Sequence, residues 1–244
     1  MENLKAYSKK YNYVIKWNAK SGCTMFRQLF LYLHKDELNI PLTNQWHELN
    51  KDFPFSKSKL NNYNIPILHL VRNPYTRCVS MFCNKYIRKE YNILFDKINI
   101  EKNSFNEFSN YLLECKNKKH YCDEHILPQS NNYHKNDIII KLETFEEDIL
   151  NFYKNFNNEL YEKVKFFLST TNIKSVFINK TNYSGDNYFC GNKIFNIGDN
   201  IFPEYNYFYN EEIQNNILNS YADDFKLYNY SSEFNFPNHL NTSN

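Results

Sequence analysis

The chain of 244 residues has only 4 glycines and a formal net charge of +2, and both scarcities exclude functions. The Walker A spacing G-x-x-x-x-G-K-[ST] is absent. A nearly balanced charge gives no general attraction to nucleic acid, so we expect no nucleic-acid partner. No hydrophobic run is long enough to cross a bilayer, and no signal peptide precedes the first apolar stretch. We therefore expect a soluble, intracellular protein of the cytoplasm.

Aromatic residues are abundant, with 21 Tyr and 21 Phe, and the hydrophobic share of 42% is ample for a core. The 6 cysteines are scattered, which favours free thiols in a reducing compartment. Strand signals alternate with helix signals, which predicts an α/β fold with a central parallel sheet flanked by helices. We expect one domain over residues 1–230, followed by a polar C-terminal tail over 231–244.

Caps and apolar spacing place the helices. Ser104 and Glu107 form a capping-box pattern that predicts a helix over about 104–114. A strand over 137–143 precedes a helix near 145–155. Further helices are expected over about 158–168 and 210–225.

The clearest local signal begins at residue 13. Tyr13–Ile15 favours a buried strand, and apolar residues recur at helical spacing from Phe26 onward. Between the two lie Lys20, Ser21, Gly22, Cys23 and Thr24. A strand–loop–helix of this kind aims backbone N–H groups and a positive helix end at one point, beside a lysine and two hydroxyls. It predicts a phosphate or sulfate site; the alternative is an ordinary turn of an α/β domain.

A second segment has the same character. Ile67–Val71 is an apolar run typical of a strand covered on both faces, and Arg72 follows at its carboxyl end, where ligands bind in open α/β sheets. Pro74 suits the first turn of a helix. Arg72 can offer a planar fork to a phosphate, and Ser80 a hydroxyl. The alternative is an arginine that caps a strand end and a serine packed on a helix.

In this order the two segments resemble the loops of sulfotransferases that use 3′-phosphoadenosine 5′-phosphosulfate (PAPS), most closely the chondroitin- and heparan-type carbohydrate sulfotransferases. Residues 19–24 resemble the family's P-K-x-x-x-T loop, with Ala19 in place of the proline. The family's R-[DN]-P-x-x-R-x-x-S loop is matched by Arg72, Asn73, Pro74, Arg77 and Ser80. Residues 123–129, 137–148 and 179–181 extend the resemblance, as does the aromatic-rich stretch that ends at 221–230. The resemblance therefore runs from about residue 12 to about 230.

The resemblance implies a P-loop-kinase-like sulfotransferase fold, with PAPS as co-substrate and no metal. It implies that Lys20 stabilises charge on the leaving phosphate. Residues 21–24 would hold the 5′-phosphate. Lys16 is either a helper in this contact or a solvated or stacking lysine of the strand. Arg72 and Ser80 would hold the 3′-phosphate. Further donor contacts are expected from Lys180 and Thr181.

The acceptor implied by the resemblance is a hydroxyl of a carbohydrate, and its proton needs a general base. His47 lies in the stretch where heparan-type relatives carry a histidine, and the adjacent Glu48 is the alternative base. His125 is a third candidate, as a base or as an acceptor contact. Gln129, in the same D-x-H-x-x-P-Q segment, is the other expected acceptor contact.

Three competing interpretations stay open from the sequence. One is a zinc site at Cys115, His120, Cys122 and His125, although their spacing matches no usual structural zinc pattern. A second is a nucleotide kinase related to P-loop proteins, which the missing Walker A lysine disfavours. A third is a module that binds 3′-phosphoadenosine 5′-phosphate (PAP) without catalysis. The sequence leaves the oligomeric state open.

Overall fold

The computed structural model describes residues 5–38, 65–88, 103–121, 123–171, 189–199 and 201–233. The chain forms two compact units. Unit 1 combines Met1–Arg72 with Asn132–Val176, and unit 2 combines Asn73–Asn131 with Phe177–Asn244. Each unit has a hydrophobic core of its own.

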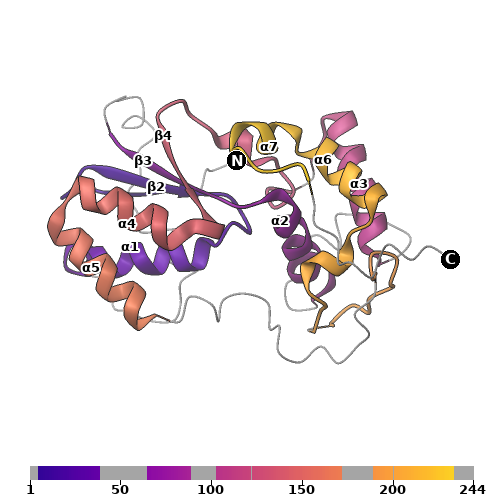
Figure 1. Cartoon of the computed structure of the whole chain (residues 1–244), viewed down its shortest axis with the longest axis horizontal. Helices are drawn as coiled ribbons and strands as arrows, with labels where there is room; N and C mark the ends of the chain where they lie inside the picture. The colour runs from indigo at the N-terminus through magenta and orange to yellow at the C-terminus, as the bar shows by residue number, and fades with distance from the viewer. Residues whose placement is uncertain are drawn as a thin grey trace. The chain divides into compact units, whose positions relative to one another are not determined.

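Unit 1 is built on a sheet of four described strands (Figure 1), in the order β1, β2, β3, β4. They are β1 (Lys5–Ser8), β2 (Tyr13–Trp17), β3 (Ile67–Val71) and β4 (Asp137–Lys141). Strands β2, β3 and β4 are parallel, as predicted, whereas β1 pairs antiparallel with β2 at the edge. The expected α/β class with a mostly parallel sheet is confirmed. The antiparallel strand was not expected, because its 4 residues are too few to show an alternation.

Three helices of unit 1 pack together beside this sheet (Figure 1): α1 (Cys23–Leu38), α4 (Phe145–Phe156) and α5 (Asn158–Thr170). Side chains alternate across a strand, so every second residue of β2 and β3 meets the helices. Ile15 and Leu68 lie on this side, in one cluster with Phe26 of α1, Ile149 of α4 and Val164 of α5. The apolar stripes of the helices thus bury one face of the sheet.

A buried hydroxyl–imidazole chain ties α1 to β2 and α4. The Tyr153 hydroxyl donates to the Tyr13 hydroxyl at 2.7 Å, and the Tyr13 hydroxyl lies 2.7 Å from His34 Nε2. His34 is also where α1 leaves helical geometry, with φ −119° and ψ 15°. The helix therefore bends at a side chain that is fixed by buried polar contacts.

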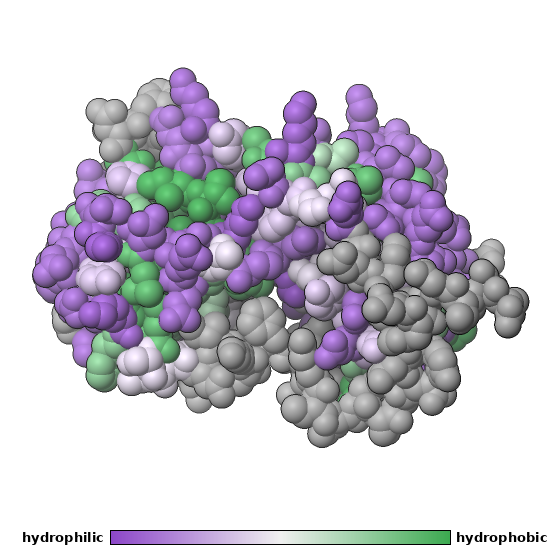
Figure 2. Space-filling view, in the orientation of Figure 1, coloured by the Kyte–Doolittle hydropathy of each residue, from purple (hydrophilic) through white to green (hydrophobic). Residues whose placement is uncertain are grey.

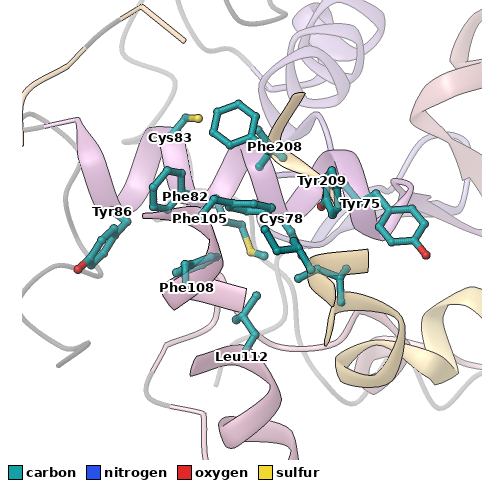
Figure 3. Close-up of a cluster of buried hydrophobic side chains, with 14 of the residues drawn as sticks. Tyr75, Cys78, Phe82, Cys83, Tyr86, Phe105, Phe108, Leu112, Phe208 and Tyr209 are labelled. Carbon is teal, nitrogen blue, oxygen red and sulfur yellow. The ribbon is translucent and has the colours of Figure 1, made fainter. Parts of the chain in front are cut away.

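Unit 2 is helical where it is described. Its elements are α2 (Pro74–Met81), the π-helical segment η3 (Phe82–Ile87), α3 (Phe105–Lys118), the 3₁₀ turn η8 (Tyr205–Phe208), α6 (Glu211–Ser220) and α7 (Ala222–Leu227). Figure 3 shows its core, where Phe82 of η3 contacts Phe105 and Phe108 of α3 with ring centroids 5.4 and 5.7 Å apart. The core of unit 2 is thus rich in Tyr and Phe.

Several predicted boundaries shift. Helix α3 starts where the capping pattern placed it, with the Ser104 side chain accepting from Glu107 N, but runs on to Lys118. The third predicted strand ends at Lys141, and Leu142–Thr144 form a 3₁₀ turn, η6. The single helix expected over 210–225 is divided at Tyr221 into α6 and α7. The boundary at residue 230 between domain and tail stays a prediction.

The described surface in Figure 2 is mainly hydrophilic, with smaller hydrophobic groups between. Within the described ranges, no helix combines the length and the apolarity needed to cross a membrane. The five cysteines found there form no disulfide.

Candidate anion-binding site

The loop between β2 and α1 is a tight turn closed by its own backbone. Ser21 N donates to the carbonyl oxygen of Asn18 at 3.2 Å, and the Ser21 side chain is fully buried. Two residues adopt left-handed backbone angles, Lys20 with φ +66° and Gly22 with φ +90°. A lysine in the left-handed conformation has an unfavourable backbone free energy, which the surrounding contacts must offset.

Gly22 is required by its conformation and by its surroundings. A Cβ atom at this position would lie 2.5 Å from Cδ1 of Leu142, in the η6 turn after β4. Since φ is also positive, any side chain here would be strained as well as in collision. The Leu142 side chain of η6 thus approaches the loop closely, and the left-handed backbone angle favours glycine at this position.

The start of α1 presents unpaired amides. The first N–H groups of a helix have no acceptor within the helix. Within the described ranges, the amides of Gly22, Cys23 and Thr24 have no hydrogen-bond acceptor, whereas the amide of Ser21 is used in closing the turn. Thr24 is exposed and adds a hydroxyl beside these amides. Amides and the positive end of the helix dipole together favour an anion at this place.

A second cation reaches the same loop from the neighbouring strand. Arg72 follows the last residue of β3, and its Nη1 donates to the carbonyl oxygen of Lys20 at 3.2 Å. Strands β2 and β3 are parallel, so their carboxyl ends lie at one edge of the sheet. One turn into α1, the Arg27 guanidinium lies over the Trp17 ring, 4.7 Å from its centroid. The Arg72 side chain therefore lies against the loop that contains Lys20, and Arg27 stacks on the last residue of β2.

The rest of the second predicted loop opens α2 in unit 2. The Asn73 side chain accepts from Tyr75 N at 2.9 Å and caps the helix, with Pro74 at its first position. Arg77 is buried, and its Nη2 donates to the carbonyl oxygens of His125 at 3.0 Å and Leu127 at 2.9 Å. Arg77 thus holds the 125–127 segment in place. Ser80 is 5% exposed, and its predicted contact with the 3′-phosphate stays a prediction.

His125 forms a dyad with Asp123. Oδ1 of Asp123 accepts from the His125 amide at 2.9 Å and makes a short contact with His125 Nδ1. A carboxylate can only accept, so Nδ1 carries a proton and Nε2 is the nitrogen that can take one up. The His125 side chain is 14% exposed. The arrangement is that of an oriented base.

Gln129 lies inside unit 2. Its side chain is fully buried, and Nε2 lies 3.4 Å from Oδ2 of Asp224, which also accepts from Gln129 N. Oδ1 of Asp224 accepts from Ser130 N, and the Tyr228 hydroxyl donates to the carbonyl oxygen of Gln129. The bonds to Asp224 hold residues 129–130 against α7. The role of Gln129 toward an acceptor stays a prediction.

Four predicted site residues lie outside the described residues: His47, Glu48, Lys180 and Thr181. Cys122 of the alternative zinc cluster also lies outside them. Within the ranges that the structure describes, no group of three or more His, Cys, Asp and Glu is placed to hold a metal ion.

Sequence reasoning missed a buried polar network on the other face of the sheet from α1. We call it the sheet-face network: Lys16, Asn18, His69, Asn132 and Asp137. Lys16 Nζ lies 2.5 Å from Oδ2 of Asp137, and His69 Nδ1 lies 3.0 Å from the same oxygen. The signal was present, because Lys16 and His69 interrupt otherwise apolar strands. Their common partner, Asp137, could not be read from the sequence. Lys16 is only 1% exposed, which excludes the alternative that it is a solvated strand lysine.

Burial and hydrogen bonding set the charges of this network. Burial lowers the pKa of His69 to about 4, with a smaller contribution from the Lys16 charge, so the ring is neutral at pH 7. Burial alone would raise the pKa of Asp137. The bonds from His69, Lys16 and the His134 amide outweigh it and lower that pKa. The network therefore holds one ion pair and one neutral imidazole.

Comparison with known proteins identifies a family for this chain. The model of the sulfotransferase family matches residues 7–231. No curated protein and no solved structure matches the chain. The family match covers both segments with the resembling loops and most of the 244 residues. The chain belongs to the sulfotransferase family.

Proposed function

We propose that this protein transfers the sulfuryl group of PAPS to a hydroxyl of an acceptor. The resemblance of its loops to those of carbohydrate sulfotransferases supports a carbohydrate as that acceptor. Membership of the sulfotransferase family supports sulfuryl transfer in general. The observation that carries the finer proposal is the hydrogen bond from Arg72 to the carbonyl oxygen of Lys20. It places the Arg72 cation against the loop that contains Lys20, at the edge of the sheet where α1 begins with unpaired amides. A donor with two separate anionic ends suits that arrangement.

The donor contacts follow from the two loops. The amides of residues 22–24 and the Thr24 hydroxyl are proposed to hold the 5′-phosphate, and Arg72 with Ser80 the 3′-phosphate. Ser21 contributes by keeping the turn closed. Lys180 and Thr181 are proposed as further donor contacts. A guanidinium can bind a phosphate through two parallel hydrogen bonds, which a lysine cannot imitate.

In the proposed reaction the acceptor oxygen forms a bond to sulfur while the bond from sulfur to the bridging oxygen breaks. The acceptor proton passes to a base, and PAP leaves with its 5′-phosphate. Charge builds up on the leaving phosphate oxygen, so a cation and fixed amide dipoles there lower the barrier. Lys20 is proposed for this role.

Three residues are candidates for the base: His47, Glu48 and His125. For His125, the Asp123 contact supports the proposal, because it leaves Nε2 as the nitrogen that can accept a proton. A base substitution should stop transfer without weakening PAP binding. The assay therefore compares single alanine variants of the three residues for turnover and for PAP affinity. The true base is the residue whose loss reduces turnover about 100-fold or more while PAP affinity stays near wild type.

The test of the proposal is transfer of label from ³⁵S-labelled PAPS to a panel of glycans and small hydroxyl compounds, without added Mg²⁺. We expect label in at least one glycan, and loss of most turnover in Lys20→Ala. Lys163→Ala is the matched control, since Lys163 is paired with Glu159 on α5. ATP binding that needs Mg²⁺, with no affinity for PAP, would instead indicate a kinase. PAP binding without any transfer would indicate a non-catalytic module.

A further inference from the structure

The sheet-face network is a chain of directed hydrogen bonds. Asp137 can only accept, so His69 Nδ1 must donate to it. In the neutral ring Nε2 then carries a lone pair, and Nδ2 of Asn18 lies 2.8 Å away as its donor. The Asn18 amide is therefore turned so that Oδ1 accepts from Nδ2 of Asn132 at 2.6 Å. Each bond fixes the direction of the next.

Lys16 closes the network. Its Nζ donates to the carbonyl oxygen of Asn132 at 2.5 Å as well as pairing with Asp137. Lys16, Asn18 and His69 are each at most 5% exposed. Each of these three side chains is bonded within the network, whereas Oδ1 of Asp137 is buried with no hydrogen-bond partner among the described residues. Removing one bonded partner leaves another buried group unpaired.

The network ends at the donor-binding loop. Asn18 is the residue after β2, and its carbonyl oxygen accepts from Ser21 N to close the turn. Lys20 adopts its left-handed angle inside that turn. On the neighbouring strand, His69 stands three residues before Arg72. Strands β2 and β3 therefore carry part of the network and lead into the proposed donor contacts.

We propose that Asn18 is a positioning residue for donor binding, because the sheet-face network fixes its side chain and thereby the turn that places Lys20 and the amides of α1. This inference rests on the proposed use of that loop for PAPS. Nothing in it requires Asn18 to touch the donor. Its effect is to hold the loop in its bound shape beforehand, which lowers the cost of binding.

The charge state of His69 decides the direction of the chain. A doubly protonated ring would present Nε2–H to Nδ2 of Asn18, so the Asn18 amide would have to turn over and lose its bond with Asn132. The charged or titratable groups that face His69 are Lys16 from β2, Asp137 from β4 and His134 from the segment before β4. Lys16 and His134 oppose a second proton on the ring, and Asp137 favours it.

The binding experiment measures the dissociation constant of PAP by calorimetry for wild type and three variants. We expect at least roughly tenfold weaker binding for Asn18→Ala, since a buried polar partner is lost. His69→Gln should bind within about threefold of wild type, because its amide can accept from Asn18 and donate to Asp137. Asn155→Ala, on an exposed position of α4, is the control and should not change binding.

The outcomes of this experiment distinguish a failure of the inference from a failure of the proposed function. If the wild-type protein does not bind PAP, both the proposed function and this inference are overturned. If the wild-type protein binds PAP and Asn18→Ala binds it equally tightly, only the inference is overturned. Should Asn18→Ala not fold, nitrogen NMR of the wild-type ring decides. We expect His69 neutral with the proton on Nδ1 between pH 6 and 8, and a proton on Nε2 in that range would refute the fixed direction of the chain.

Discussion

Arg72 donates from Nη1 to the carbonyl oxygen of Lys20 at 3.2 Å, so the arginine after β3 holds the loop after β2. This contact joins residues 52 positions apart, and the planar guanidinium carries five N–H donors in all. It places a permanent positive charge beside the turn in which Lys20 has a left-handed backbone. The contact joins the first residue of the second motif to the loop of the first motif within unit 1.

Replacing Arg72 should chiefly weaken donor binding. Arg72→Ala removes the bond to the Lys20 carbonyl and the fork proposed for the 3′-phosphate, and we expect PAP affinity to fall roughly 10- to 100-fold. Arg72→Lys should recover only part of this, since a point charge cannot form two parallel bonds. Calorimetry with PAP measures both, with Lys163→Ala as the control. Unchanged affinity in Arg72→Ala would reject this residue as the 3′-phosphate contact.

Gly22→Ala should destabilise unit 1 and distort the loop. The new Cβ would collide with Leu142 at 2.5 Å, and the positive φ adds strain, so we expect a loss of about 1–3 kcal/mol in the free energy of unfolding. Urea unfolding measures it. In the background of Leu142→Ala the collision is relieved while the strain remains, so the further loss caused by Gly22→Ala should become smaller. An equal loss in both backgrounds would exclude the collision as a cause.

Stability should fall as the medium becomes acidic. The pKa of His69 is about 4 in the folded chain against an ordinary 6.5. Between these values the unfolded chain binds a proton that the folded chain does not. The stabilisation is therefore complete above pH 6.5 and is lost as the pH falls toward 4, by up to about 3 kcal/mol. The lowered pKa of Asp137 acts in the same direction at lower pH.

His69→Gln is the control for this pH dependence. The variant keeps hydrogen-bonding groups toward Asn18 and Asp137 but cannot titrate, so its unfolding free energy should change less between pH 7 and pH 5 than that of wild type. Chemical unfolding at a series of pH values gives the comparison. Identical slopes for the two proteins would show that His69 does not carry the effect.

Arg77 should prove structural although it lies in the same motif as Arg72. Arg77→Ala removes a buried side chain and the donor to the carbonyls of His125 and Leu127, so we expect the free energy of unfolding to fall by about 2–5 kcal/mol. At a temperature where the variant is folded, PAP affinity should stay within about threefold of wild type. Lys118→Ala, on the exposed end of α3, serves as the control. A large loss of PAP affinity without a loss of stability would assign Arg77 to the donor instead.

Local sequence patterns were enough to predict the strands and helices next to the candidate site. The apolar runs of β2 and β3 and the caps of α2 and α3 depend on neighbouring residues, so their spacing could be read directly. The sheet-face network depends on contacts such as that between Lys16 and Asn132, which are 116 positions apart. No local pattern reports such a contact. A charged residue in an apolar strand signals only that some partner exists.

The division at Tyr221 and the left-handed Lys20 were missed for a different reason. Both conformations are stabilised by tertiary contacts, the Tyr221 hydroxyl donating to the carbonyl oxygen of Ile126 and the Lys20 carbonyl accepting from Arg72. Intrinsic preferences favour neither. The candidate bases His47 and Glu48 lie outside the described residues, so their assignment still rests on the resemblance.

The most direct measurement is a crystal structure of the complex with PAP. We expect the 5′-phosphate within hydrogen-bond distance of the amides of residues 22–24 and of Lys20, and the 3′-phosphate on the Arg72 guanidinium. A nucleotide bound elsewhere, or one whose 3′-phosphate lies away from Arg72, would contradict a single donor site formed by the two strand ends.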